Sequence, residues 1–318
     1  MTTSNGMKRS TLLILILFVT VVSNAQFIPY SQFQITPVLT NPAAAGMSDY
    51  TEITAQYKQS RVANYEIPSL SFIHPLYHSN KMRFGGIGAS LVNQSAGPRK
   101  LFNMTGIMAG YAHVIHISSK HHVSAGIQGG MVNKRIDASK ITTDNQYNLG
   151  AYDPSLSTGE NFSNTSVTKP VFNAGASWFL TNKQGDQVAC LGAAAYNMNT
   201  PSYDLLATGS TEMVTWIFSG DVIAWRRDRV SVRPSFRYIV SNSSVGNFGL
   251  SAQYKLTGGH EISAGSWYKS NNALVFNLQY SQLNYFIAAA HEFSTGSSQE
   301  VNINNSVEVA LGWRIKRK

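Results

Sequence analysis

Residues 247–256 read NFGLSAQYKL, and apolar side chains alternate with small or polar ones through the whole stretch. The apolar set falls at every second position, on Phe248, Leu250, Ala252, Tyr254 and Leu256. Successive side chains of a β-strand point to opposite faces, so this period of two predicts a strand with one apolar and one wet face.

The same alternation recurs along most of the chain, for example in 230–240, 274–281 and 307–316. Pro234 interrupts one of these runs, and proline cannot donate to a β-ladder. Each segment has about ten residues, the length that a tilted strand needs to cross a bilayer. We expect strands at 52–60, 66–77, 83–93, 103–117, 121–134, 170–181, 187–198, 213–225, 229–240, 246–256, 259–269, 273–281, 284–293 and 305–315.

Loop lengths and composition favour a membrane barrel over a soluble β-sandwich, which would show the same alternation. The long connections 135–169, 199–212 and 294–304 all fall on one side of the predicted sheet, while the turns on the other side are short. Charged residues make up 13% and aromatic residues 11% of the chain. The sequence therefore predicts an all-β fold, an antiparallel transmembrane outer-membrane β-barrel of about 14 strands, with its short turns in the periplasm.

The first 25 residues are typical of a secretory signal peptide. Lys8 and Arg9 precede an apolar run over 11–22, and Ser23-Asn24-Ala25 places small residues at the cleavage positions. Twelve residues of helix rise only about 18 Å, short of the hydrocarbon core, which disfavours an uncleaved anchor. Cys190 is the only cysteine, so we expect no internal disulfide in this exported chain. We expect the mature protein to start at Gln26 and to reside in the cell outer membrane.

The next stretch, 26–46, reads QFIPYSQFQITPVLTNPAAAG and has neither a helix nor a strand period. Pro29, Pro37 and Pro42 fix φ and bias the preceding residues toward extended conformations. The segment is uncharged and largely apolar, which favours an ordered strap over a disordered periplasmic tail. We therefore divide the chain into the signal peptide 1–25, an N-terminal periplasmic strap 26–50 and a transmembrane β-barrel 51–318.

The strap carries the first part of a family resemblance. Ser31-Gln32-Phe33 and the run from Pro37 through Asn41, Pro42 and Ala43 to Gly46 resemble the N-terminal signature of the PorP/SprF family. Further motifs follow in family order, namely Tyr57–Arg61, Gly85–Ser90, Ser124–Gly130, Asp153-Pro154 and Val171–Gly175. No single motif is specific, but the ordered set is.

The resemblance implies an outer-membrane β-barrel of the type IX secretion system and of gliding motility. The implied function is that of a non-enzymatic component or accessory that helps to export a client, such as a large adhesin, or to attach it to the cell surface. Its implied partners are outer-membrane lipid, other type IX secretion components and the secreted or surface-anchored client. From the fold alone, an outer-membrane porin or substrate-specific channel is the alternative.

Catalytic, cofactor and metal motifs are weak in this sequence. His113 and His116 fall on opposite faces of a strand, and so do His121 and His122, which disfavours a zinc site. Asp144, Asp153 and Glu160 share a long loop but lack the spacing of an EF-hand. We find no catalytic triad or carboxylate pair, and we expect no enzyme activity, no cofactor and no bound metal.

Basic residues gather near the predicted periplasmic turns. Nucleic acid is implausible as a partner in that compartment. The choice lies between ordinary solvated turns and an electrostatic surface for a periplasmic partner. The candidate surface, which we call the basic rim, comprises Arg226, Arg227, Arg229, Arg314, Lys316, Arg317 and Lys318.

Overall fold

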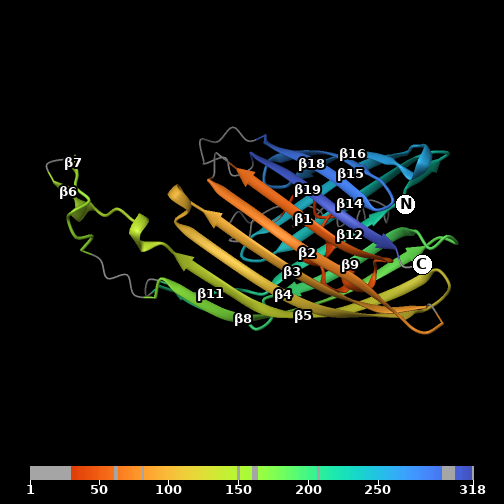
Figure 1. Cartoon of the computed structure of the whole chain (residues 1–318), viewed down its shortest axis with the longest axis horizontal. Coiled ribbons are helices and arrows are strands. Elements are labelled where there is room, and N and C mark those ends of the chain that lie inside the picture. Colours follow the sequence, from red (N-terminus) through yellow and green to blue (C-terminus); the bar gives the residue numbers. More distant parts are fainter. Residues whose placement is uncertain are drawn as a thin grey trace, which may run out of the picture.

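The chain forms a closed antiparallel β-barrel (Figure 1). The computed structural model describes residues 30–60, 64–80, 82–148, 151–159, 164–205, 208–295 and 305–316. Neighbouring strands of the sheet are also neighbours in the chain, the first strand pairs with the last, and β12 pairs with β14 to complete the ring. With β12 and β13 counted as one because both run along β14, the barrel has fourteen strands among the described residues, as predicted.

The strands match the expected segments within a few residues. Those of the barrel are β1 (Tyr50–Ser60), β2 (Tyr65–Tyr77), β3 (Arg83–Ala96), β4 (Phe102–His116), β5 (His121–Ile136), β8 (Ser166–Thr181), β9 (Gln187–Tyr196), β12 (Thr215–Val222), β13 (Trp225–Arg227), β14 (Val230–Val240), β15 (Ser244–Lys255), β16 (Glu261–Lys269), β17 (Ala273–Ser281), β18 (Tyr285–Ser294) and β19 (Ser306–Lys316). Two small hairpins outside the barrel wall are β6 (Tyr147–Asn148) with β7 (Ala151–Tyr152) and β10 (Ser202–Leu205) with β11 (Thr208–Thr211). Short 3₁₀ turns are η1 (Pro37–Leu39), η2 (Pro42–Gly46), η3 (Pro98–Lys100), η4 (Ala138–Lys140), η5 (Asp144–Gln146) and η6 (Thr257–Gly259).

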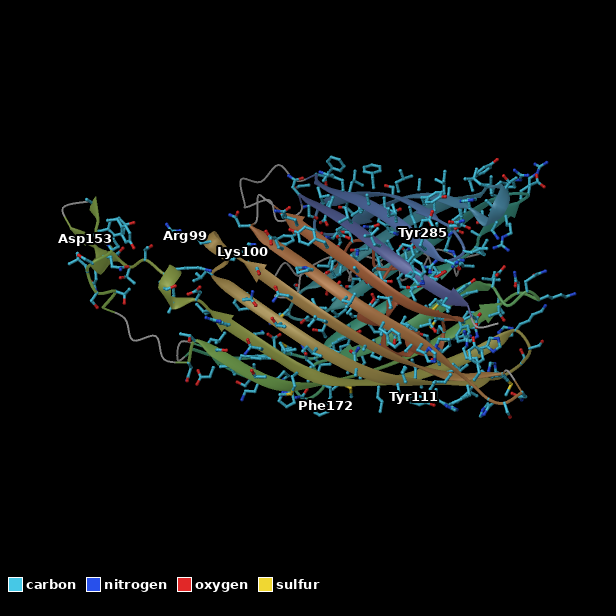
Figure 2. All side chains as sticks on the ribbon, viewed as in Figure 1. Arg99, Lys100, Tyr111, Asp153, Phe172 and Tyr285 are labelled. Atoms are coloured by element: carbon cyan, nitrogen blue, oxygen red, sulfur yellow. The ribbon has the colours of Figure 1, made fainter. Side chains whose placement is uncertain are left out.

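The period of two becomes an outer apolar face and an inner, mostly small or polar face. In β19, Leu311 is 58% exposed while Ala310 is buried at 2%. Tyr111 and Phe172 lie along the outer surface of the wall in Figure 2, and both are exposed. A ring of outward aromatic and aliphatic side chains is what a lipid-facing band requires. Among the described residues, no helix is both long enough and apolar enough to span a membrane.

The predicted strand 213–225 is split into β12 and β13, and Pro234 on the neighbouring strand explains the split. Asp221 pairs with Ser235, whereas Trp225 pairs with Val232, so residues 222–224 oppose only 233–234. This mismatch of one residue is a β-bulge. The break between β12 and β13 thus lies opposite Pro234, which has no N–H to donate to the ladder. Strand β14 itself continues through the proline.

The two ends of the barrel differ in the length of their connections. The long-loop end carries the β6–β7 and β10–β11 hairpins, and the first of these projects far from the wall in Figure 1. The short-turn end carries the connections after β2, β4, β8, β13, β15 and β17. The assignment of the short-turn end to the periplasm stays a prediction.

Candidate functional site

Residues 30–49, the described part of the strap that precedes β1, run through the interior of the barrel. The Tyr30 hydroxyl donates to the Ile67 carbonyl, near the long-loop end of β2, at 2.7 Å. At the other end of the strap, Arg83 donates a hydrogen bond of 2.8 Å to the Met47 carbonyl. Arg83 is the first residue of β3 and lies at the short-turn end. The strap therefore passes down the lumen and enters β1 from the short-turn end.

Apolar strap side chains pack against opposite parts of the wall. Phe33 clusters with Trp267, Val275 and Ala290 on β16, β17 and β18. Ile35 clusters with Phe286, Ala288 and Ala310, while Tyr30 packs on Tyr65 and Ile67. The 3₁₀ turn η2 lies against β3, β4, β5 and β8 on the far side. Because the segment touches both sides of the barrel wall, it crosses the lumen from one side to the other.

Glu308 on β19 holds the start of the strap. Its carboxylate oxygens accept hydrogen bonds from the backbone amides of Ser31 at 2.6 Å and Gln32 at 3.0 Å. The ammonium group of Lys58 lies 3.0 Å from the same carboxylate, and both side chains are almost completely buried. Two amides and one cation thus compensate a charge that would otherwise be costly to bury.

Glu292 on β18 extends this arrangement to a second lysine. Its carboxylate lies 3.1 Å from Lys58 Nζ and 2.6 Å from Lys269 Nζ, and it accepts a 2.5 Å hydrogen bond from the Ser31 hydroxyl. Arg237 on β14 adds a hydrogen bond of 2.7 Å from Nη2 to the Tyr30 carbonyl. We call Lys58, Arg237, Lys269, Glu292 and Glu308 the lumen network. The lumen network contacts the backbone of the strap and the side chain of one serine. It therefore fixes the position of the strap but depends little on the identity of the strap side chains.

The signature residues that the family resemblance singles out form the middle of the strap. Asn41 caps η2: its Oδ1 accepts from the Ala43 amide at 2.9 Å. Its Nδ2 donates to the Ala176 carbonyl and to Ser177 Oγ, at 3.1 and 3.0 Å, and so ties the turn to β8. Pro37 and Pro42 begin η1 and η2, where the missing N–H costs nothing. Pro42, Ala43 and Gly46 are buried between the strap and the wall.

Two wall glycines allow the strap to approach the strands closely. A Cβ on Gly86 of β3 would lie 1.9 Å from the Ala45 carbonyl oxygen. A Cβ on Gly126 of β5 would lie 2.6 Å from the Pro42 carbonyl carbon and 2.7 Å from the Ala43 nitrogen. Backbone atoms cannot move aside as a flexible side chain can, so these positions require glycine while the strap is in place.

The strap separates two cavities. The long-loop cavity has a volume of about 190 Å³ and lies between the strap and the β10–β11 hairpin, with Tyr203, Glu212 and Lys134 among its lining residues. The short-turn cavity, of about 250 Å³, is lined by Asn41, Met47, Asp221 and the free thiol of Cys190, among others.

Only part of the basic rim forms an exposed cluster in the structure. Arg226, Arg227 and Arg229 are exposed at the β13–β14 hairpin, and the single ion pair there, Arg227 with Asp228, is long at 4.0 Å. Arg314 instead pairs with Glu52 at 2.5 Å and lies over the Phe286 ring. Lys316 ends β19, although its side chain is not described, and Arg317 and Lys318 lie outside the described residues.

The histidines form one close pair rather than a metal centre. His116 and His122 are cross-strand partners on β4 and β5, with their Nδ1 atoms 2.7 Å apart. Their Nε2 atoms contact the Arg83 carbonyl and Thr181 Oγ1. No group of three His, Cys, Asp or Glu that could hold a metal ion occurs among the residues described. In the long loop, Asp153 (Figure 2) accepts hydrogen bonds from the Ser155 amide and hydroxyl, which lower the pKa of its carboxyl group, and Glu160 lies outside the described residues.

The lumen network was not anticipated from the sequence. A signal was present, because Glu308 and Arg237 fall on the polar faces of their period-two segments, and charges at such positions point into the lumen. Alternation alone, however, could not show which strands bring their charges together or that the strap lies between them.

Comparisons with known proteins extend these observations. A family model described as "Type IX secretion system membrane protein PorP/SprF" matches residues 22–313. No curated protein matches the sequence. Among solved structures, the TodX monoaromatic hydrocarbon channel, as a deltaS2 mutant, has a TM-score of 0.50 at 10% identity, with 89% of this chain and 94% of that chain covered. A FadL homologue of Pseudomonas aeruginosa has a TM-score of 0.49 at 13% identity, with the same coverage. At 10% identity, the likeness to the TodX channel shows the barrel fold alone.

Proposed function

Because the chain belongs to the PorP/SprF family of type IX secretion system membrane proteins, we propose that it is a non-enzymatic component or accessory of this system. It resides in the outer membrane, where a barrel of this kind is placed. Its role is to help export a client protein or to hold the client at the cell surface, and a large adhesin is the client class that we favour. The observation that carries this proposal is the family match over residues 22–313.

The strap that crosses the lumen supports the secretion role over the alternative of an open porin. A porin needs a continuous polar channel, whereas here the strap crosses the lumen and is fixed at Glu308, Glu292 and Asn41. A barrel with such a segment across its lumen suits a protein that acts through its loops and its exposed ends. We propose further that the basic rim, above all Arg226, Arg227 and Arg229, contacts an acidic periplasmic component.

The test compares the surface and secreted proteomes of a strain without the gene, the parent strain and a strain complemented with the intact gene. We expect loss of a large surface protein in the first strain and its recovery on complementation. In parallel, the purified barrel should conduct no steady ion current in a planar bilayer. An unchanged proteome together with steady conductance would replace this proposal with the porin.

A further inference from the structure

The long-loop cavity has a predominantly apolar lining and a size suited to a small ligand. Its volume is about 190 Å³, and its apolar walls include Val92, Met104, Met108, Val132, Ile217 and Ile239. An apolar cavity of about 150 Å³ is known to hold benzene. The space above the strap is therefore large enough for a benzene-sized group with a polar substituent.

One buried cation lines this cavity without a carboxylate partner. Arg237 is 3% exposed, its Nη2 donates to the Tyr30 carbonyl, and its guanidinium carbon lies 4.6 Å from the centre of the Phe33 ring. Its Nε has no hydrogen-bond partner. Among the described residues, no carboxylate oxygen lies within ion-pair distance of Arg237.

The carboxylates near Arg237 are paired with other groups. Glu292 and Glu308 bind Lys58, Lys269 and the start of the strap. The lumen network therefore contains three cations and two carboxylates, and the excess positive charge is on the side that faces the cavity. The other cation of the lining, Lys134, is already paired with Glu212 and lies over the Tyr203 ring.

A second orphaned donor lines the same cavity. The hydroxyl of Ser90 on β3 is buried and has no hydrogen-bond partner. Unpaired buried polar groups are rare in proteins, and each one calls for a partner. A cavity surface that is mostly apolar, with polar groups at fixed points, is the pattern of a small-molecule site.

From this arrangement we propose that the long-loop cavity binds a small carboxylate carried on an apolar body about the size of a benzene ring. The carboxylate accepts from the Arg237 guanidinium, in a charge-assisted hydrogen bond that neutralises the excess charge of the lumen network. The apolar body lies among Met104, Met108 and Val132. This site is independent of the secretion role and of the basic rim.

The experiment uses the purified full-length protein in an uncharged detergent, with benzoate as the probe and benzamide as its neutral counterpart of equal shape. Affinity is measured by titration with ligand-observed NMR. We expect benzoate to bind about tenfold more tightly than benzamide, because both accept from the charged guanidinium but only the carboxylate also neutralises its charge. Hexanoate against hexanol repeats the comparison with a flexible apolar body.

Two variants locate the binding site. Arg237→Gln should remove the preference for benzoate over benzamide. Gly106→Leu should abolish binding of both, because a Cβ there lies 3.5 Å from Val132, an ordinary contact, and the longer side chain fills the cavity while Arg237 stays intact. Gly129→Leu is the control, since a Cβ on Gly129 lies beside the outward-facing Phe172.

The proposal fails on any of three results. These are the absence of benzoate binding to the wild-type protein at millimolar concentration, equal affinity for benzoate and benzamide, and undiminished binding in Gly106→Leu. If Arg237→Gln does not fold, as judged by its mobility in unheated gels, then Gly106→Leu and the benzamide comparison decide the question alone.

Discussion

At the scale of single residues, the most consequential feature is the pair of carboxylates inside the lumen. Lys58, Glu292 and Glu308 are each at most 2% exposed. Burying such charges is costly, and ion pairs and hydrogen bonds offset part of that cost. Here the backbone amides of Ser31 and Gln32 donate hydrogen bonds to the Glu308 carboxylate in addition to its lysine contact, so the strap itself stabilises the buried charge.

Glu308→Ala should therefore cost about 3–5 kcal/mol in the free energy of unfolding, since it leaves Lys58 with half of its compensation. The measurement is urea unfolding in lipid vesicles, followed by tryptophan fluorescence. Glu66→Gln serves as the control: Glu66 also has a lysine partner, Lys100, but Lys100 is exposed and Glu66 is partly exposed, so loss of the pair should cost less than about 1 kcal/mol. Equal losses in the two variants would contradict a structural role for the buried carboxylate.

At the scale of elements, the strap is held as much by shape as by charge. Asn41 joins η2 to β8, and Gly86 and Gly126 let the backbone of the strap lie directly on the wall. A segment packed this closely has few alternative positions, because neither the strand nor the strap backbone can yield.

Gly126→Val should displace the strap without dissolving the barrel, because the new side chain would overlap Pro42 and Ala43. Cys190 offers a natural reporter: it is the only cysteine and lines the short-turn cavity beside Asn41 and Ala44. We expect maleimide to label Cys190 faster in this variant than in the wild type. Gly129→Val, whose Cβ would make only ordinary contacts at 3.5 Å, should label at the wild-type rate. Identical rates in all three proteins would mean that the glycine does not position the strap.

At the scale of the whole molecule, the outward apolar band places the protein in the membrane. Leu278→Arg should lower the free energy of unfolding by about 2–4 kcal/mol, since Leu278 is exposed on the outer face of β17, well inside the strand. Leu283→Arg replaces an equally exposed leucine in the turn after β17, where arginine should cost about 0–1 kcal/mol. Unfolding from vesicles measures both, and a larger loss for the turn variant would invalidate the inferred depth of the band.

The charge distribution of the whole molecule leads to a further test, of the proposed partner surface. Replacement of Arg226 and Arg227 by Gln should weaken co-purification with periplasmic components while barrel assembly stays normal. Added salt should weaken the wild-type contact too, because exposed charges are screened over about 8 Å at physiological ionic strength. The control exchanges Lys120 and Lys183, which are also exposed at the short-turn end, for Gln. Indistinguishable pull-downs at low salt would reduce the rim to a solvated edge.

Much of this fold could be predicted because a barrel strand carries its own signal. Alternation in 247–256 and 307–316 identifies both the strand and the face that meets lipid, and the loop lengths give the order of the ends. The split at β12 and β13 was missed, since a bulge depends on the register against Pro234 of the neighbouring strand. The joining of His116 with His122 likewise depends on cross-strand register.

The sequence by itself determined the barrel, its strand count, its outer surface and the resemblance that places it in its family. These are local properties, repeated in every strand and readable one segment at a time. Only the tertiary structure decided that the strap crosses the lumen, that Lys58, Glu292 and Glu308 meet around it, and that Arg237 faces a cavity without an acidic partner. These contacts join residues up to 277 positions apart. Closure of the ring brings them together, and no period within a single strand encodes that closure.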